Sequence, residues 1–458
     1  MREQTSLEVV GKRVAVIGLG RSGLAAVRLL QRLGAHVTVA DQKPCSDVAA
    51  ALGGLPAGAV AIHGAGDYES ALRGAEVVVV SPGVPLTLDP LQRARAAGAR
   101  IIGELELASR HLTHRMIAVT GTNGKSTTVT WIGELLRGAG YNPFIGGNLG
   151  TPLAEAAMAS LDGRAWDIIV AEVSSFQLET IETFRPWIGA VLNVTPDHLD
   201  RYPSMEAYAA AKLRLLENQD ATDYAVLNAD DPWLSRAAAR SLGARIEFSR
   251  TRSVERGLYV ERDMILSNLF GRREAVCRVG DVHVRGAHNI ENAMAAAAVA
   301  VLAGCPMDGI SRGLRAFRGL EHAMEVVRVL RGVAYINDSK GTNVDATIKA
   351  LETVPAPVIL IAGGREKGGE YPGLAETVRR KARRVILLGE ARARLHEVLA
   401  GACPLAEVAS LREAVRDAAN TAVAGDTVLL SPACASFDMF ADYKDRGRQF
   451  KELVHELG

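Results

Sequence analysis

A glycine-rich loop at 120–127 contains Gly124-Lys125-Ser126, a combination typical of phosphate binding. The backbone N–H groups of such a loop surround phosphate oxygens, the lysine adds positive charge beside them, and the serine hydroxyl can bind Mg²⁺. The complete motif would have a glycine at 119, where this chain has Val119, so the loop is a shortened variant. It follows the apolar run 116–119 and precedes a helix predicted over 127–137. This context favours ATP binding.

Polar side chains that would complete such a site occur further along the chain. Glu172 follows the apolar run 168–170, where a buried strand would end and where ligands bind in open α/β sheets. A lone glutamate at a strand end is, however, more often solvated. His198 lies in the polar segment 193–201, either as a ligand or as a capping or core histidine. Lys212 interrupts an otherwise apolar helical stretch, and its ordinary interpretation is a lysine that extends its ammonium group to solvent.

An earlier glycine loop, 18–23, stands between a predicted strand and a predicted helix. Glycines at this place allow a tight turn and a close approach of backbone N–H groups to a diphosphate. Asp41 ends the next predicted strand, about where an acidic residue would contact a ribose hydroxyl. The alternative is a turn that only packs the helix onto the strand. The motif does not identify the nucleotide, and NAD is the ligand first expected from it.

Three polar segments in the last third of the chain each follow a predicted strand, at 337–343, 363–368 and 431–438. His322 precedes them. Any one of these segments is compatible with a plain turn. Together, at the carboxyl ends of neighbouring strands, they predict a crevice rich in hydrogen-bond donors and cations, which suits an anionic substrate.

Buried strands that alternate with helices are expected to position these loops. Strands are predicted at 14–17, 37–40, 77–80, 116–119, 333–336, 358–361, 385–388 and 427–430, and helices at 24–33, 91–97 and 127–137. Uniformly apolar strands alternating with helices favour an α/β fold whose parallel sheets are covered on both faces. We expect domain boundaries near 110 and 319. The charged stretch 250–273, with short mixed strands, is expected to carry no chemistry.

Length and composition limit the classes of protein that remain. A chain of 458 residues suggests about three domains. With 53 basic and 52 acidic residues, the formal net charge is +1, which argues against a globally basic nucleic-acid binder. Five scattered cysteines without a CxxC pair argue against a disulfide framework or a zinc finger. The apolar run 293–303 is too short to cross a membrane and no signal peptide is visible, so we expect a soluble cytoplasmic protein, monomeric by default.

These residues together resemble the Mur ligase family over essentially the whole chain. The resemblance rests on segments 120–127, 172–179, 193–202, 337–343 and 431–440. The strings at 174–179 and 431–438 are similar to the family member that adds D-glutamate, whereas sister ligases that add other amino acids differ there. The resemblance implies a three-domain Mur ligase architecture. A Rossmann-like domain at 1–109 would bind the UDP substrate, a central P-loop ATPase domain would span 110–318, and a Rossmann-like domain at 319–458 would bind the amino acid.

The function implied by the resemblance is ATP-dependent joining of D-glutamate to UDP-N-acetylmuramoyl-L-alanine through an acyl phosphate, in peptidoglycan precursor synthesis. UDP would then replace NAD at the first glycine loop. The implied catalytic residues are Lys125, His198, Lys212 and Lys340. The implied ATP contacts are Gly121, Thr122, Asn123, Gly124, Lys125, Ser126, Thr127, Asn289, Asn292, His322 and Asp338. The implied UDP-substrate contacts are Gly20, Arg21, Ser22, Asp41, Gly83, Asn148 and His198. The implied D-glutamate contacts are Thr342, Lys367, Ser436, Phe437 and Tyr443. The implied Mg²⁺ ligands are Ser126, Glu172, His198 and, if carbamylated, Lys212.

One position departs from the family pattern. Ala323 follows His322 where the family usually has arginine, a residue that would stabilise charge on the terminal phosphate. The departure raises a question about rate and not about identity. Three alternatives stay open: a sister ligase that adds another amino acid, an NAD-dependent dehydrogenase with a fused ATPase domain, and a non-catalytic nucleotide-binding regulator.

Overall fold

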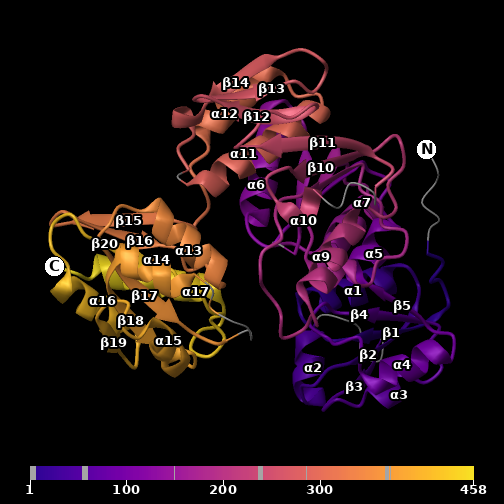
Figure 1. Cartoon of the computed structure of the whole chain (residues 1–458). Coiled ribbons are helices and arrows are strands. Elements are labelled where there is room, and N and C mark those ends of the chain that lie inside the picture. Colours follow the sequence, from indigo (N-terminus) through magenta and orange to yellow (C-terminus); the bar gives the residue numbers. More distant parts are fainter. Residues whose placement is uncertain are drawn as a thin grey trace.

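The chain forms three β-sheets in succession, each flanked by helices (Figure 1). The computed structural model describes residues 7–53, 60–148, 150–235, 241–284, 286–366, 371 and 373–458. In Figure 1 the first part (indigo) lies against the second (magenta), and the third (orange to yellow) lies beside them. None of the helices in these described ranges is long and apolar enough to cross a membrane.

The first sheet has five parallel strands in the order β3-β2-β1-β4-β5. From the central strand β1 the chain moves outward to β2 and β3, then crosses back to β4 on the other side. This reversal creates a crevice at the carboxyl ends of β1 and β4, the usual ligand position in such sheets. The strands are β1 (Arg13–Ile17), β2 (His36–Ala40), β3 (Val60–His63), β4 (Val77–Val80) and β5 (Arg100–Gly103), and the helices are α1 (Arg21–Arg32), α2 (Cys45–Ala51), α3 (Tyr68–Leu72), α4 (Asp89–Ala96) and α5 (Glu104–Ser109).

The second sheet has nine strands in the order β14-β13-β12-β11-β10-β9-β6-β8-β7. Its buried strands around β6 are parallel, whereas β13 pairs antiparallel with both β12 and β14. The charged stretch 250–273 therefore extends this sheet at one edge. The strands are β6 (Met116–Thr120), β7 (Pro143–Gly147), β8 (Ile168–Glu172), β9 (Ile188–Val191), β10 (Tyr224–Asn228), β11 (Ala244–Ser249), β12 (Gly257–Glu261), β13 (Met264–Ser267) and β14 (Glu274–Arg278). The helices are α6 (Lys125–Gly138), α7 (Leu153–Leu161), α8 (Ser175–Leu178), α9 (Met205–Leu213), α10 (Pro232–Ser235), α11 (Ala287–Leu302) and α12 (Met307–Ala316).

The third sheet has six strands in the order β15-β16-β20-β17-β18-β19, parallel except at the β15 edge. The strands are β15 (Glu325–Leu330), β16 (Val333–Asn337), β17 (Val358–Gly363), β18 (Ala382–Leu388), β19 (Leu405–Glu407) and β20 (Thr427–Leu430). The helices are α13 (Val344–Thr353), α14 (Leu374–Lys381), α15 (Arg392–Leu399), α16 (Leu411–Thr421) and α17 (Tyr443–His455). The predicted α/β class with Rossmann-like outer domains is confirmed.

Buried carboxylates of helix α5 attach the first part of the chain to the second. The carboxylate of Glu106 accepts hydrogen bonds from the backbone N–H groups of Glu182, Thr183 and Phe184 and from the guanidinium of Arg110. Because Glu106 is fully buried, these donors are needed to compensate for its lost hydration. The contact holds the sheet that carries the glycine loop 18–23 against the sheet that carries the loop 120–127.

Candidate functional site

The loop that was predicted to bind phosphate connects β6 to α6, and α6 begins at Lys125. Gly124 has a φ of 85°, and a Cβ atom at this residue would lie 2.3 Å from the side-chain oxygen of Asn292. A glycine is therefore required both for the turn and for the close approach of α11. The ammonium group of Lys125 donates to the carbonyl oxygens of Gly121 and Thr122, at 2.8 and 2.7 Å. The lysine is thus held over its own loop.

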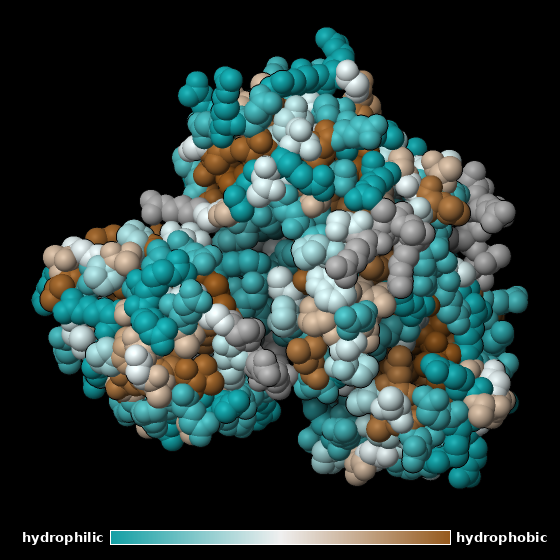
Figure 2. All heavy atoms as spheres, in the orientation of Figure 1, coloured by the Kyte–Doolittle hydropathy of each residue, from teal (hydrophilic) through white to brown (hydrophobic). Residues whose placement is uncertain are grey.

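A cavity of about 250 Å³ opens in front of this loop. Segments far apart in the sequence form its walls: the P-loop, the ends of β7 and β8, the start of α11, and the third domain between 319 and 350. Figure 2 shows a hydrophilic surface around the hollow between the third part of the chain and the other two. We call this cavity the ATP cavity after the ligand expected there. The predicted site residues that line it are Thr122, Asn123, Gly124, Lys125, Ser126, Thr127, Asn148, Glu172, His198, Asn289, Asn292, Asp338, Lys340 and Thr342.

Two oxygen-bearing side chains in this cavity are joined by a short hydrogen bond. The hydroxyl of Ser126 donates to one carboxylate oxygen of Glu172 at 2.5 Å, and the amide of Asn148 donates to the other at 2.7 Å. Glu172 is buried, so its interpretation as a solvated residue is wrong. A hydroxyl and a carboxylate are hard oxygen donors of the kind that Mg²⁺ prefers, and His198 lines the same cavity. This set of donors fits a magnesium ion.

Lys212 is buried, with 2% of its surface exposed, and does not extend to solvent. Its ammonium nitrogen lies 3.0 Å from the carbonyl oxygen of Gly121 and 4.4 Å from the ring centre of Tyr208. Burial, followed by repulsion from Lys125, lowers the pKa of Lys212 well below its ordinary value. The interpretation as a solvent-extended lysine is therefore wrong, because this side chain points into the protein behind the P-loop.

The segment after β9 carries His198 to the cavity in an unusual backbone conformation. His198 has a φ of 56°, in the left-handed region that residues with a Cβ rarely adopt. Its ring packs edge-on against Phe176, with 4.7 Å between ring centres. Asp197 precedes it and also lines the cavity. Such a constraint at a cavity wall is typical of functional positions and favours the ligand interpretation over that of a core histidine.

A second cavity lies at the carboxyl ends of β1 and β4, as the strand order requires. The carboxylate of Asp41 accepts hydrogen bonds from the backbone N–H groups of Leu19 and Lys43, at 2.6 and 3.0 Å, and so holds the glycine loop. A Cβ atom on Gly23 would lie 2.0 Å from the carbonyl oxygen of Gly18, which explains the third glycine of the motif. The predicted UDP-substrate residues lining this cavity are Gly20, Arg21, Ser22, Asp41, Gly83 and Asn148.

Asn148 lines both cavities, so the two sites meet at this residue. The guanidinium of Arg21 also reaches across, donating to the carbonyl oxygen of Gly150 at 3.3 Å. A ligand bound on the first domain can therefore extend, past Asn148, to the phosphate site of the second domain.

The third domain contributes Asp338 and Lys340 from the loop after β16. Burial raises the pKa of Asp338 to about 7, although it accepts a 2.7 Å hydrogen bond from the hydroxyl of Ser431. The ammonium group of Lys340 lies 4.8 Å from the ring centre of Tyr443. Of the other predicted D-glutamate residues, Ser436 is buried, Phe437 is 64% exposed, and Lys367 lies outside the described residues. Among the described members of this set, Thr342 alone lines the ATP cavity.

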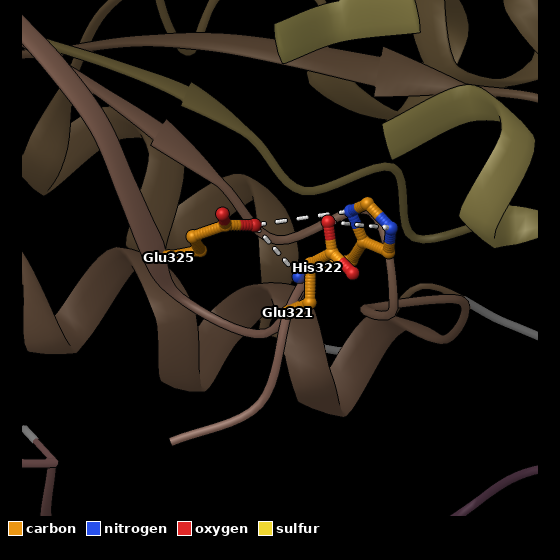
Figure 3. Close-up of side chains that lie close together, drawn as sticks. All are labelled: Glu321, His322 and Glu325. Atoms are coloured by element: carbon orange, nitrogen blue, oxygen red, sulfur yellow. Dashed lines mark hydrogen bonds and ion pairs between the residues drawn. The ribbon is translucent and has the colours of Figure 1, made fainter. Parts of the chain in front are cut away.

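His322 is buried next to the ATP cavity, between two glutamates (Figure 3). A ring nitrogen of His322 lies 2.9 Å from the side-chain amide of Asn337, and Glu325 accepts the backbone N–H of His322. Glu321, His322 and Glu325 are close enough to share a cation. However, the ammonium group of Lys451 already lies 2.8 and 2.6 Å from the two glutamates, so we interpret the group as an ion-pair network.

Sequence reasoning missed four polar residues in the ATP cavity: Asp197, His288, Asn343 and Lys349. Burial, together with the nearby charge of Lys349, lowers the pKa of His288 to about 4. Asp197 and Asn343 lie in the polar segments 193–201 and 337–343. The pattern of these segments indicates a site, but it does not indicate these two side chains. Lys349 lies on the cavity side of α13, and no motif marks it.

Three models of protein families match the chain in succession. The N-terminal domain of MurD-like Mur ligases matches residues 12–103, the Mur ligase middle domain matches 119–300, and the glutamate ligase domain of Mur ligases matches 323–434. Each match contains one of the three sheets or most of it.

Two curated relatives extend this similarity over nearly the full length. The chain is 46% identical over 449 residues to UDP-N-acetylmuramoylalanine–D-glutamate ligase of Pelotomaculum thermopropionicum, covering 97% of this chain and 98% of that protein. It is 43% identical to the ligase of the same name from Syntrophotalea carbinolica, covering 98% and 99%.

Solved structures share the fold. MurF ligase from Thermotoga maritima in complex with ADP superposes with a TM-score of 0.62 at 17% identity, over 100% of both chains. UDP-N-acetylmuramate-alanine ligase MurC from the same organism superposes with a TM-score of 0.60 at 19% identity, over 98% of this chain and 100% of that one.

Proposed function

This chain belongs to the Mur ligase family, and we propose that it joins D-glutamate to UDP-N-acetylmuramoyl-L-alanine with the conversion of ATP to ADP and phosphate. The observation that carries the proposal is the meeting of a nucleotide-type cavity and a P-loop cavity at Asn148. The names of relatives at 42–46% identity over nearly the full chain support D-glutamate as the amino acid. Within peptidoglycan precursor synthesis this is an amide-bond-forming step.

The first chemical step activates a carboxylate, which by itself is a poor electrophile. The alanyl carboxylate oxygen attacks the γ-phosphorus of ATP, the bond from that phosphorus to the bridging oxygen breaks, and ADP leaves with an acyl phosphate remaining. Two anions must approach each other, so positive charge is needed between them. Lys125 and Lys340 both line the cavity and would supply it. Asn148, placed at the junction, would orient the carboxylate.

The second step forms the amide. The amine of D-glutamate attacks the acyl carbon, the carbon–oxygen bond to phosphate breaks, and the amine nitrogen loses its extra proton. The ammonium group of Lys340 lies 4.8 Å from the ring centre of Tyr443, and this pair supports the assignment of the amino-acid site to the third domain. Thr342, Lys367, Ser436 and Phe437 complete the proposed contacts. Since the two substrates would bind to different domains, closure of the third domain onto the second is required.

Magnesium is the proposed metal of the ATP cavity. Ser126, Glu172 and His198 would hold it, and when bound it neutralises phosphate charge. The hydrogen bond from Ser126 to Glu172 supports this assignment, because it brings together an oxygen ligand at the start of α6 and one at the end of β8.

Carbamylation of Lys212 is proposed for the same site. A neutral amine attacks carbon dioxide and releases one proton, which yields a carbamate. The lowered pKa of Lys212 favours the neutral amine that this reaction requires. A carbamate would also replace the repulsion between Lys212 and Lys125 by attraction.

Three further assignments belong to the proposal. The domain limits 1–109, 110–318 and 319–458 are supported by the presence of one sheet within each segment. A cytoplasmic location follows from the nucleotide substrates. A monomer is the working assumption.

The test is phosphate release from ATP with UDP-N-acetylmuramoyl-L-alanine and a panel of amino acids. We expect release with D-glutamate alone among D-glutamate, L-glutamate, L-alanine and a diamino acid, and no change in nicotinamide absorbance. Release with a different amino acid would favour a sister ligase. Absence of release with every amino acid, while ATP still binds, would favour the non-catalytic regulator.

A further inference from the structure

One carboxylate oxygen of the third domain accepts hydrogen bonds from two separate segments of the central domain. The Oδ2 atom of Asp345, in the first turn of α13, lies 2.7 Å from the side-chain nitrogen of Asn123 and 2.9 Å from the hydroxyl of Thr195. Asn123 belongs to the P-loop, and Thr195 belongs to the segment that leads to His198. A third donor, Lys349 of the same helix, lies 2.8 Å from this oxygen. Asp345 thus connects both halves of the phosphate site to the third domain.

The side chain of Asn123 is held at both of its ends. Its nitrogen donates to Asp345, and its oxygen accepts a 3.2 Å hydrogen bond from the side-chain amide of Asn343. The same amide of Asn343 donates to Asp197 at 3.1 Å. Among the described residues of the central domain, Asn193 holds the backbone of Asn123, at 2.9 and 3.1 Å, and none holds its side chain. The position of this P-loop side chain therefore depends on the third domain.

Helix α13 is also linked to Asp338 through Ser431, which follows β20. The hydroxyl of Thr347 donates to the carbonyl oxygen of Ser431, whose own hydroxyl donates to Asp338. The first two turns of α13 therefore connect the P-loop, on one side, to Asp338 of the third domain, on the other. A helix is stiff enough to set the distance between them.

We propose that Asp345 is a positioning residue of the ligation reaction: it fixes Asn123 and Thr195 when the third domain docks, and so sets the P-loop against the segment of His198. Asp345 acts through these residues, and its neighbours Asn343 and Ala346, not Asp345 itself, are among the residues lining the cavity. The proposal rests on the proposed ligase function only for the kinetic part of its test.

A simpler role for Asp345 is that of an acidic residue at the start of a helix. Such a charge stabilises its own helix whichever residues surround it. That role does not explain why two of its three donors belong to another domain, 222 and 150 residues away in sequence. A matched control is available, because Glu376 is the acidic residue in the first turn of α14 of the same domain and is exposed.

A double-mutant cycle on the full-length enzyme separates these roles. We expect Asp345→Ala to lower kcat about tenfold, with a smaller change in KM for D-glutamate, and Thr195→Val to lower kcat severalfold. The double variant should be little worse than Asp345→Ala, since contacting residues are not additive. Glu376→Ala alone should leave kcat unchanged, and adding it to Thr195→Val should lower kcat no further than Thr195→Val does by itself. Independent, multiplicative effects of Asp345→Ala and Thr195→Val would overturn the proposal.

If the wild-type enzyme shows no D-glutamate-dependent phosphate release, the proposed ligase function fails. Hydrogen exchange then still tests whether Asp345 positions the P-loop. In Asp345→Ala, amide exchange should become faster in peptides covering 121–128 and 193–198, and in Glu376→Ala it should not. Faster exchange confined to α13 would mean a local helix role and would overturn the proposal.

Discussion

The ammonium groups of Lys125 and Lys212 both donate to the carbonyl oxygen of Gly121, at 2.8 and 3.0 Å. Two cations that share one acceptor repel each other, and this repulsion adds to burial in lowering the pKa of Lys212. The two lysines therefore cannot have the same function. Lys125 is at the start of α6, whereas Lys212 lies behind the loop, where burial and the charge of Lys125 favour its neutral form.

Replacing Lys212 by alanine should reduce ligation by more than about a hundredfold, beyond the 10–100-fold cost of losing an outer-shell metal partner. Bicarbonate should not restore the activity, because the amine that would be carbamylated is absent. A small carboxylate such as formate should restore part of it by providing an oxygen ligand. Phosphate release with and without formate measures this, and the same additions to the wild-type enzyme serve as control. A wild-type rate at saturating Mg²⁺ would contradict the role of Lys212.

Lys125→Ala should abolish ligation while the UDP substrate still binds with nearly unchanged affinity. The reason is that Lys125 lies in the ATP cavity, whereas the other cavity is formed mainly by the first domain. Calorimetric titration with UDP-N-acetylmuramoyl-L-alanine and a phosphate-release assay measure the two effects separately. Normal phosphate release by the variant would refute the P-loop assignment.

Ala323→Arg should raise kcat by about one to two powers of ten, which corresponds to about 1.4 kcal/mol for each. Ala323 lines the ATP cavity on the side of the third domain, so a guanidinium there would meet the negative charge of the transferring phosphoryl group. The KM for D-glutamate should change less, because the arginine acts on phosphate. If kcat stays unchanged, another cation already serves this purpose, and Arg318 in the adjoining cavity is the first candidate.

Glu104→Gln should stabilise the protein at pH 8 by about 2–3 kcal/mol and have little effect at pH 5. Burial raises the pKa of Glu104 to about 7, above 4.5 for an ordinary glutamate. Between these pH values the carboxyl ionises only in the unfolded chain, so the wild-type protein loses stability as pH rises. One oxygen of Glu104 accepts the backbone N–H of Ala154, which glutamine also permits. Urea unfolding from pH 5 to 8 measures the difference, and a pH-independent difference would refute this account.

Much of the fold could be predicted because the buried strands are short apolar runs bounded by glycine and polar residues. The strands at 77–80 and 427–430 agree with β4 and β20 residue for residue. Helix α1 begins at Arg21 and not at 24, since the glycine loop leads directly into the helix. The positions of the ligand-binding loops could be predicted as well. In a parallel sheet the strands all end at the same edge, so the loops that follow them lie together there.

What could not be predicted depends on how the domains meet. The contact of Asp345 with Asn123 joins residues 222 positions apart, and no local pattern indicates it. The burial of Lys212 depends on Tyr208 and the P-loop packing around it, whereas its sequence context suggested solvent. Periodicity reports which face of an element is covered, and it does not report which domain covers it.

The central claim is that the alanyl carboxylate crosses from the first cavity to the ATP cavity past Asn148 and takes up the γ-phosphoryl group. Labelling that carboxylate with oxygen-18 tests the claim most directly. The account predicts that one labelled oxygen per turnover is transferred to inorganic phosphate, detected by mass spectrometry, and only when D-glutamate is present. Retention of both labelled oxygens outside the phosphate would contradict it, because no bond between the carboxylate and phosphorus would then have formed.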